Sequence, residues 1–164
     1  MSTEKIGPTG RPEVFDAVLL GGGIAGVLDG LDAVIYYYLA FGVTPALLFQ
    51  NIASGILGPR SFRGGWWTTA LGIVLHFSIA IGAAAVFYAA SLVLPSLMRK
   101  PVIVGPAFGV VVYAAMHYVV LPISAVPKRT VPVSAAEFVD QILSHTLFVG
   151  LPIALMARRS AWSS

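Results

Sequence analysis

The sequence predicts an all-α membrane protein, a four-transmembrane-helix bundle with a short interfacial helix between its first and second spans. Two observations come from composition: 57% of the 164 residues are hydrophobic and only 10% are charged, whereas soluble domains have about 25% charged residues. The third is the arrangement of the apolar residues in four continuous runs, each supplying the roughly 20 residues that a helix needs to cross a bilayer. Continuous runs favour helices over the alternating strands of an outer-membrane barrel.

The first two predicted spans differ in their content and their ends. Span one covers residues 16–42 and is interrupted only by Asp29 and Asp32. Span two covers residues 67–95 and begins at the tandem Trp66-Trp67. Because tryptophan concentrates at membrane interfaces, this start is the best-marked boundary in the sequence.

The third and fourth predicted spans, residues 102–125 and 137–157, follow residues that favour the start of a helix. Pro101 precedes span three, and proline is over-represented in the first helical turn. Ser134 precedes span four, and Glu137 follows it three residues later, a pairing that caps helix N-termini. We therefore expect both spans to begin close to these positions.

The segment between spans one and two predicts a short helix over residues 46–57. It is too short to span a bilayer and too apolar to lie free in water, so we expect it in the membrane interface. Residues 1–14 predict a mobile tail, and no signal peptide, because the apolar run that follows is too long for one. Residues 15–159 then form one transmembrane domain, and residues 160–164 a C-terminal tail.

The topology follows from the basic residues of the loops. With four spans both termini lie on one side of the membrane, where six lysines and arginines gather against four on the other side. Cytoplasmic loops carry the excess, so both termini are predicted to be cytoplasmic. The lipid bilayer is one expected partner, and a homo-oligomer or a larger membrane complex is a second. No basic cluster with interleaved aromatic residues indicates nucleic acid.

A glycine motif in span one has two interpretations. Residues 21–26 match G-x-G-x-x-G, the pattern with which a Rossmann unit binds FAD or NAD. That chemistry also needs a βαβ unit and an acid about 20 residues further on, but no acid lies between Asp32 and Glu137. We therefore expect no FAD or NAD. The glycine face, defined as Gly22, Gly26 and Gly30, instead predicts close helix packing within the chain or between protomers.

Polar residues recur at one depth in all four spans. At about 1.5 Å per residue, each ionisable group lies about 12 to 20 Å from the same membrane surface. Such groups cost about 2.5 to 3.5 kcal/mol on insertion scales and therefore face a bundle interior or a cavity. We expect a buried polar site for protons or substrate. It comprises the ionisable residues and the polar neighbours on their helix faces: Asp29, Asp32, Tyr36, His76, Tyr113, His117, Gln141 and His145.

Several chemistries fit this polar layer, as we call these eight residues. Acids and imidazoles within a membrane can bind protons reversibly, which suits a relay or a substrate site. Zinc, iron or manganese would use His76, His117, His145 and Asp32 as ligands, and two histidines could ligate haem. The same residues could also simply hydrogen-bond between helices. No nucleophile with an ordered triad is present, so no catalytic residue is predicted and an enzyme is disfavoured.

Four stretches resemble a group of small four-span bacterial inner-membrane proteins of unknown function. The resemblance covers about residues 15–157 and implies a bacterial inner (plasma) membrane setting without implying an activity. The stretches are Gly30-Leu-Asp32-Ala33, Gln50-Asn-Ile-Ala-Ser-Gly55-Ile-Leu-Gly58, Gly65-Trp-Trp-Thr-Thr-Ala-Leu-Gly72-Ile-Val-Leu-His76-Phe77 and Tyr113-Ala-Ala-Met-His117-Tyr-Val-Val-Leu-Pro122.

The leading functional hypothesis is a small transport or ion-handling membrane protein with a buried protonatable site. The alternative is an accessory or structural subunit of a larger membrane complex, in which the glycine face makes the important contact. A metal- or haem-binding membrane protein is the third hypothesis.

Overall fold

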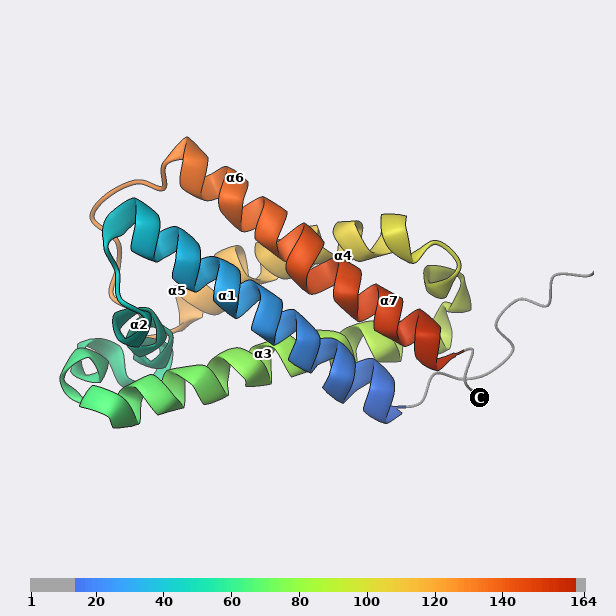
Figure 1. The fold of residues 1–164 in the computed structure, drawn as a ribbon, viewed down its shortest axis with the longest axis horizontal. Coiled ribbons are helices and arrows are strands. Elements are labelled where there is room, and N and C mark those ends of the chain that lie inside the picture. The colour runs from blue at the N-terminus through green and yellow to red at the C-terminus, as the bar shows by residue number, and fades with distance from the viewer. Residues whose placement is uncertain (1–13, 162–164) are drawn as a thin grey trace, which may run out of the picture.

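The computed structural model describes residues 14–161, which form helices and their connections with no strand in that range. Four helices are long and apolar enough to cross a membrane: Phe15–Phe41, Gly65–Val93, Pro101–Ile123 and Ala135–Ser160. The first helix starts, and the last helix ends, at the same end of the bundle (Figure 1). The predicted all-α bundle of four spans is confirmed, and the chain is a multi-pass membrane protein.

Three of the spans combine α-helix with one wider π-helical turn, whereas the second span, α3 (Gly65–Val93), is α-helical throughout. The other spans are, in order, η1 (Phe15–Leu20) with α1 (Gly21–Phe41); α4 (Pro101–Ala115), η4 (Met116–Val120) and α5 (Leu121–Ile123); and α6 (Ala135–Ser144), η5 (His145–Gly150) and α7 (Leu151–Ser160). Span four departs most from its predicted bounds, since α7 continues to Ser160 where residue 157 was expected.

The connections contain the remaining helices. Helix α2 (Pro45–Leu57) continues into the 3-10 turn η2 (Gly58–Arg63), and the 3-10 turn η3 (Pro95–Met98) joins the second and third spans. The Thr44 hydroxyl caps α2 by accepting a hydrogen bond from the Leu47 amide at 3.3 Å. Ser134 caps α6 in the same way through the Glu137 amide at 3.1 Å. Both helices therefore begin with the same kind of hydroxyl cap, of which Ser134 was predicted from the sequence.

Most of the two predicted tails falls outside the described residues. Of the predicted N-terminal tail, residues 1–14, only Val14 is described. Of the predicted C-terminal tail, Ser160 ends α7 and is fully buried, and Ala161 follows it at 1% exposure. These two residues therefore belong to the packed bundle and not to a tail.

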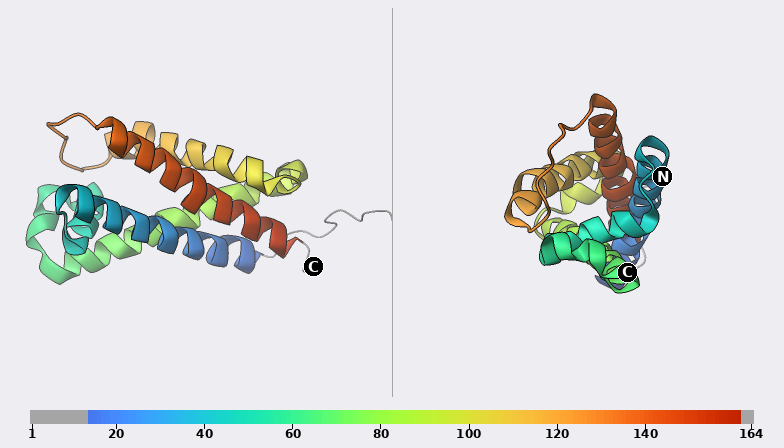
Figure 2. Two further views of the ribbon diagram at one scale, coloured as in Figure 1. Left: turned by 45° about the horizontal axis from the view of Figure 1, so that its top comes forward. Right: turned by 90° about the vertical axis from the view of Figure 1, so that its left-hand side faces the viewer.

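Helix α2 crosses the start of α3. A Cβ atom at Gly72 would lie 1.8 Å from the Phe49 carbonyl oxygen, so the two backbones touch at this crossing. The segment after α5 joins them, because the Ala125 amide donates a hydrogen bond to the Gly55 carbonyl at 2.9 Å. Both connections lie at the end of the bundle opposite the termini (Figure 2). The expected location of α2 in the membrane interface stays a prediction.

The glycine face packs against α3 of the same chain. A Cβ at Gly22 would lie 2.6 Å from the Ile81 Cα, and one at Gly26 would lie 2.8 Å from the Phe77 ring. At Gly30 the nearest atom would be His76 Nε2, at 3.1 Å. The dinucleotide-like motif thus lies inside one continuous helix, where its glycines admit a neighbouring helix.

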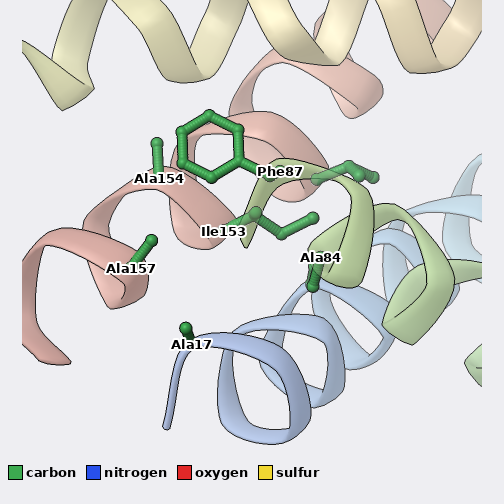
Figure 3. Close-up of a cluster of buried hydrophobic side chains, with 8 residues drawn as sticks. Ala17, Ala84, Phe87, Ile153, Ala154 and Ala157 are labelled. Carbon is green, nitrogen blue, oxygen red and sulfur yellow. The ribbon is translucent and has the colours of Figure 1, made fainter. Parts of the chain in front are cut away.

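The apolar core occupies the half of the bundle near the termini, which we call the packed half. Its side chains are mostly small, and Phe87 and Ile153 are the largest of them (Figure 3). Close backbone contacts continue this packing between α4 and span four, where a Cβ at Gly150 would lie 2.0 Å from the Gly105 carbonyl oxygen. Helices in this half are therefore joined by van der Waals contact of small residues, as is typical within membranes. The core comprises Ala17, Ala25, Ala84, Phe87, Val149, Ile153, Ala154 and Ala157.

Candidate functional site

A partly open cavity of about 270 Å³ separates the spans in the other half of the bundle, which we call the cavity half. Every span contributes polar side chains to its wall, and α2 contributes Ile52. Among residues 14–161, no lysine or arginine lines it. The polar lining residues are Asp29, Asp32, Tyr37, His76, Tyr113, His117, Asp140, Gln141, Ser144 and His145.

All but one of the predicted polar-layer residues line this cavity. The exception is Tyr36, whose ring packs edge-on against those of Tyr37 and Phe41, with centroids 5.5 and 6.0 Å away. The neighbouring Tyr37 lines the cavity instead. Its hydroxyl reaches α6, where it donates a hydrogen bond to Glu137 at 2.8 Å. The site position expected of Tyr36 is therefore taken by Tyr37, because Tyr37 faces the helix that packs there.

Three carboxylates face the cavity from two adjacent helices. Asp29 of α1 accepts a hydrogen bond of 2.8 Å from the Ser144 hydroxyl of α6, which ties the two helices together. Asp140 of α6 lies within electrostatic range of Asp29 and Asp32. Among residues 14–161 no hydrogen bond or ion pair neutralises Asp32 or Asp140. Two of the three acids thus remain available to a proton or a cation.

Each of the three histidine rings makes a different contact. His76 Nε2 donates to the Gly26 carbonyl at 2.8 Å, and His145 Nδ1 donates to the Gln141 carbonyl at 2.9 Å. Because a carbonyl only accepts, these nitrogens carry the proton, and the other nitrogen of each ring can accept. His117 stacks on Tyr113 with ring centroids 5.6 Å apart. The three rings are therefore positioned by three different contacts, two with backbone carbonyls and one with an aromatic ring.

Two of these histidines lie at the start of π-helical turns. His145 is the first residue of η5, and His117 is the second residue of η4. A π-helical turn widens the helix by one residue and is frequent at functional sites. Tyr113 lies between the two turns, with His117 stacked on its ring and His145 edge-on to it at 5.6 Å. The two turns thus bring three aromatic side chains into contact at the cavity wall.

The predicted metal ligands do not gather at one point. Among residues 14–161, no group of three or more histidine and acidic side chains is arranged to hold a metal ion. His76, His117 and His145 line the cavity from three different spans, and two of them are bonded to backbone carbonyls. A zinc, iron or manganese site formed by these histidines and Asp32 therefore has no support in the structure.

An ion pair between the buried Glu137 and the half-exposed Arg129 lies beside the cavity. Glu137 is 1% exposed, and both its oxygens accept from the Arg129 guanidinium, Nη2 to Oε2 at 3.0 Å. Tyr37 donates to the same carboxylate, and Gln141 Nε2 donates to the Tyr37 hydroxyl at 3.2 Å. The hydrogen bond to Glu137 raises the pKa of Arg129, which lies in the loop outside the spans. This network fastens that loop to α1 and α6.

Asp140 and Ser144 are cavity residues that the predicted site did not include. A signal for Asp140 exists, because it precedes Ser144 by four residues and so shares its helix face with Ser144 and the predicted Gln141. Glu137 was predicted only as a capping residue, and nothing in sequence pairs it with Arg129. Tyr37, which donates to the same carboxylate, lies 100 residues away in the sequence, and local spacing carries no information about such a pairing.

No protein-family model, curated protein or solved structure matches the chain. The fold and the site therefore define its class by themselves, as a multi-pass membrane protein of four spans with an acid- and histidine-lined cavity.

Proposed function

We propose that this chain is a small transport or ion-handling membrane protein and that the cavity is its protonatable binding site. One observation carries the proposal: three aspartates and three histidines from all four spans line a single cavity, to which the described part of the chain contributes no lysine or arginine. Ionisable residues inside a membrane are costly and mark ion or substrate pathways and proton relays. Helix packing alone would not require so many of them around open space.

The chemistry of the wall supports reversible ion binding. Carboxylates that face one another repel, and a bound proton or cation reduces this repulsion. Asp32 is the central group, because Asp29 of its own helix is already bonded to Ser144. His76 lines the same cavity from α3, Tyr113 and His117 from the third span, and Asp140 and His145 from the fourth. Histidine exchanges protons near neutral pH, so this set can respond to physiological pH changes.

The test is proton flux in liposomes under an imposed pH gradient, followed with a trapped pH-sensitive dye. We expect wild-type protein to give a pH-dependent flux and Asp32→Asn to remove it, because the amide cannot take up a proton. Asp16→Asn is the matched control, since Asp16 is on the same span but not on the cavity wall. Equal flux through wild-type and Asp32→Asn protein would contradict the proposal.

The accessory-subunit alternative depended on the glycine face as a contact for another protein. Since α3 of the same chain already packs on Gly22, Gly26 and Gly30, that face gives the alternative no support. Within the proposal, the protein belongs to the bacterial inner membrane with both termini cytoplasmic, as the loop charges and the family resemblance favour. On that orientation the cavity half lies toward the outer surface.

A further inference from the structure

The cavity wall has two chemically different parts. The carboxylates all come from α1 and α6, which lie side by side and are joined by the Asp29–Ser144 hydrogen bond (Figure 1). The second and third spans supply most of the apolar surface, including Ile79, Ala83 and Val112. A ligand that matches both parts needs a positively charged end and an apolar body.

Tyr113 gives an independent indication of a ligand. Its side chain lines the cavity and is only 6% exposed, yet its hydroxyl has no hydrogen-bond partner among residues 14–161. The hydroxyl oxygen is not among the fully buried atoms of the described residues, so it is accessible, and a ligand that donates a hydrogen bond to it would be stabilised. The aromatic ring also attracts cations.

The size and the charge of the cavity narrow the ligand class. A volume of about 270 Å³ exceeds what a bare ion fills and approaches the roughly 300 Å³ at the lower end of small-molecule pockets. An anion would be repelled by Asp29, Asp32 and Asp140, and a neutral molecule would leave their charges uncompensated. Metal ions are disfavoured because no three ligands gather among the described residues.

We propose that the cavity binds an organic cation, a protonated primary amine carrying a small apolar body. The ammonium group donates hydrogen bonds to Asp32, Asp140 and the Tyr113 hydroxyl, and the apolar body packs against the second and third spans. The inference rests on the proposed function, because it names the substrate class of the same protonatable site. A bound amine and a proton then compete for the same carboxylates.

The experiment compares two probes of similar shape, 2-phenylethylamine and 2-phenylethanol. The first ends in a charged ammonium group and the second in a neutral hydroxyl. Binding to the full chain in nanodiscs is measured by equilibrium dialysis of the radiolabelled probes, with protein-free nanodiscs to subtract lipid partitioning. We expect saturable binding of the amine, at least about tenfold tighter than that of the alcohol, since charge-assisted hydrogen bonds contribute that much. Asp32→Asn and Asp140→Asn should each weaken amine binding about tenfold, and Asp16→Asn should leave it unchanged.

A second variant keeps the test decisive if the aspartate variants do not fold. Ala83→Leu fills part of the apolar wall and keeps every carboxylate, so it should weaken amine binding several-fold while the protein retains its elution volume. Absence of saturable amine binding, or equal binding of amine and alcohol, would overturn this inference. Proton flux without any amine is measured separately, so a retained Asp32-dependent flux would leave the proposed function standing while the substrate class fails.

Discussion

The packed half and the cavity half of the bundle are built from the same four spans, yet they differ in what lies between the helices. Near the termini, glycine and alanine bring backbones into contact, as at Gly150 and Gly105. Further along the same helices, polar and aromatic side chains line about 270 Å³ of open space. Small residues therefore form the closely packed part of this protein, and the costly polar residues are concentrated where space remains.

The largest predicted loss of stability comes from a substitution in the packed half. In Gly150→Ala the new methyl group would lie 2.0 Å from the Gly105 carbonyl oxygen, which forces α4 away from span four. We expect a loss of about 3 kcal/mol or more in the free energy of unfolding, measured by thermal denaturation in detergent micelles. Gly82→Ala is the control, because a Cβ there meets nothing within 4 Å. Equal stability of the two variants would contradict the packing described above.

The next effect concerns the ion pair beside the cavity half. Arg129→Gln leaves the buried Glu137 carboxylate without its cation, and we expect a loss of about 2 kcal/mol, less than for a fully buried pair because Arg129 is 50% exposed. The double variant Arg129→Gln with Glu137→Gln should recover part of this loss in a double-mutant cycle. Lys128→Gln is the control on the same loop. Additive losses in the cycle would show that the pair contributes nothing.

The smallest predicted loss of stability comes from a substitution at the cavity wall. Ser144→Ala removes the hydrogen bond that joins α6 to Asp29, and we expect a loss of about 1 kcal/mol in unfolding free energy. Ser78→Ala removes only a bond to the Val74 carbonyl of its own helix, and should change stability less. If the two serine variants are equally stable, the contact between the spans adds nothing beyond a local one.

The sequence predicted the four spans, but it did not predict how each helix is rotated or which side chains pair. The runs of apolar residues located all four spans, whereas the expected common depth of the aspartates and histidines in the membrane stays a prediction. Tyr36 was expected at the cavity, but Tyr37 lies there. The sequence could not decide between them, because tertiary packing sets which side of α1 is covered by α6. The π-helical turns at Met116 and His145 also change the angle between successive side chains, so a fixed 100° per residue no longer applies beyond them.

The predicted metal site likewise separates what the sequence can predict from what depends on tertiary packing. The sequence placed three histidines in three spans, and all three line the same cavity. Whether their rings meet depends on hydrogen bonds such as those of His76 to Gly26 and His145 to Gln141, which hold each of these two rings on a backbone carbonyl. The spacing of residues in the sequence predicts neither bond, because the acceptors are backbone carbonyls, which are present at every position.

The crossing of α2 over α3 limits how this sequence can change over time. Since a Cβ at residue 72 would lie 1.8 Å from the Phe49 carbonyl oxygen, that residue cannot be replaced unless α2 moves with it. Ile52 of α2 is part of the cavity wall, so any such movement also reshapes the cavity. Relatives that keep glycine at the equivalent of position 72 should share this cavity, and those with larger residues there should share only the four spans.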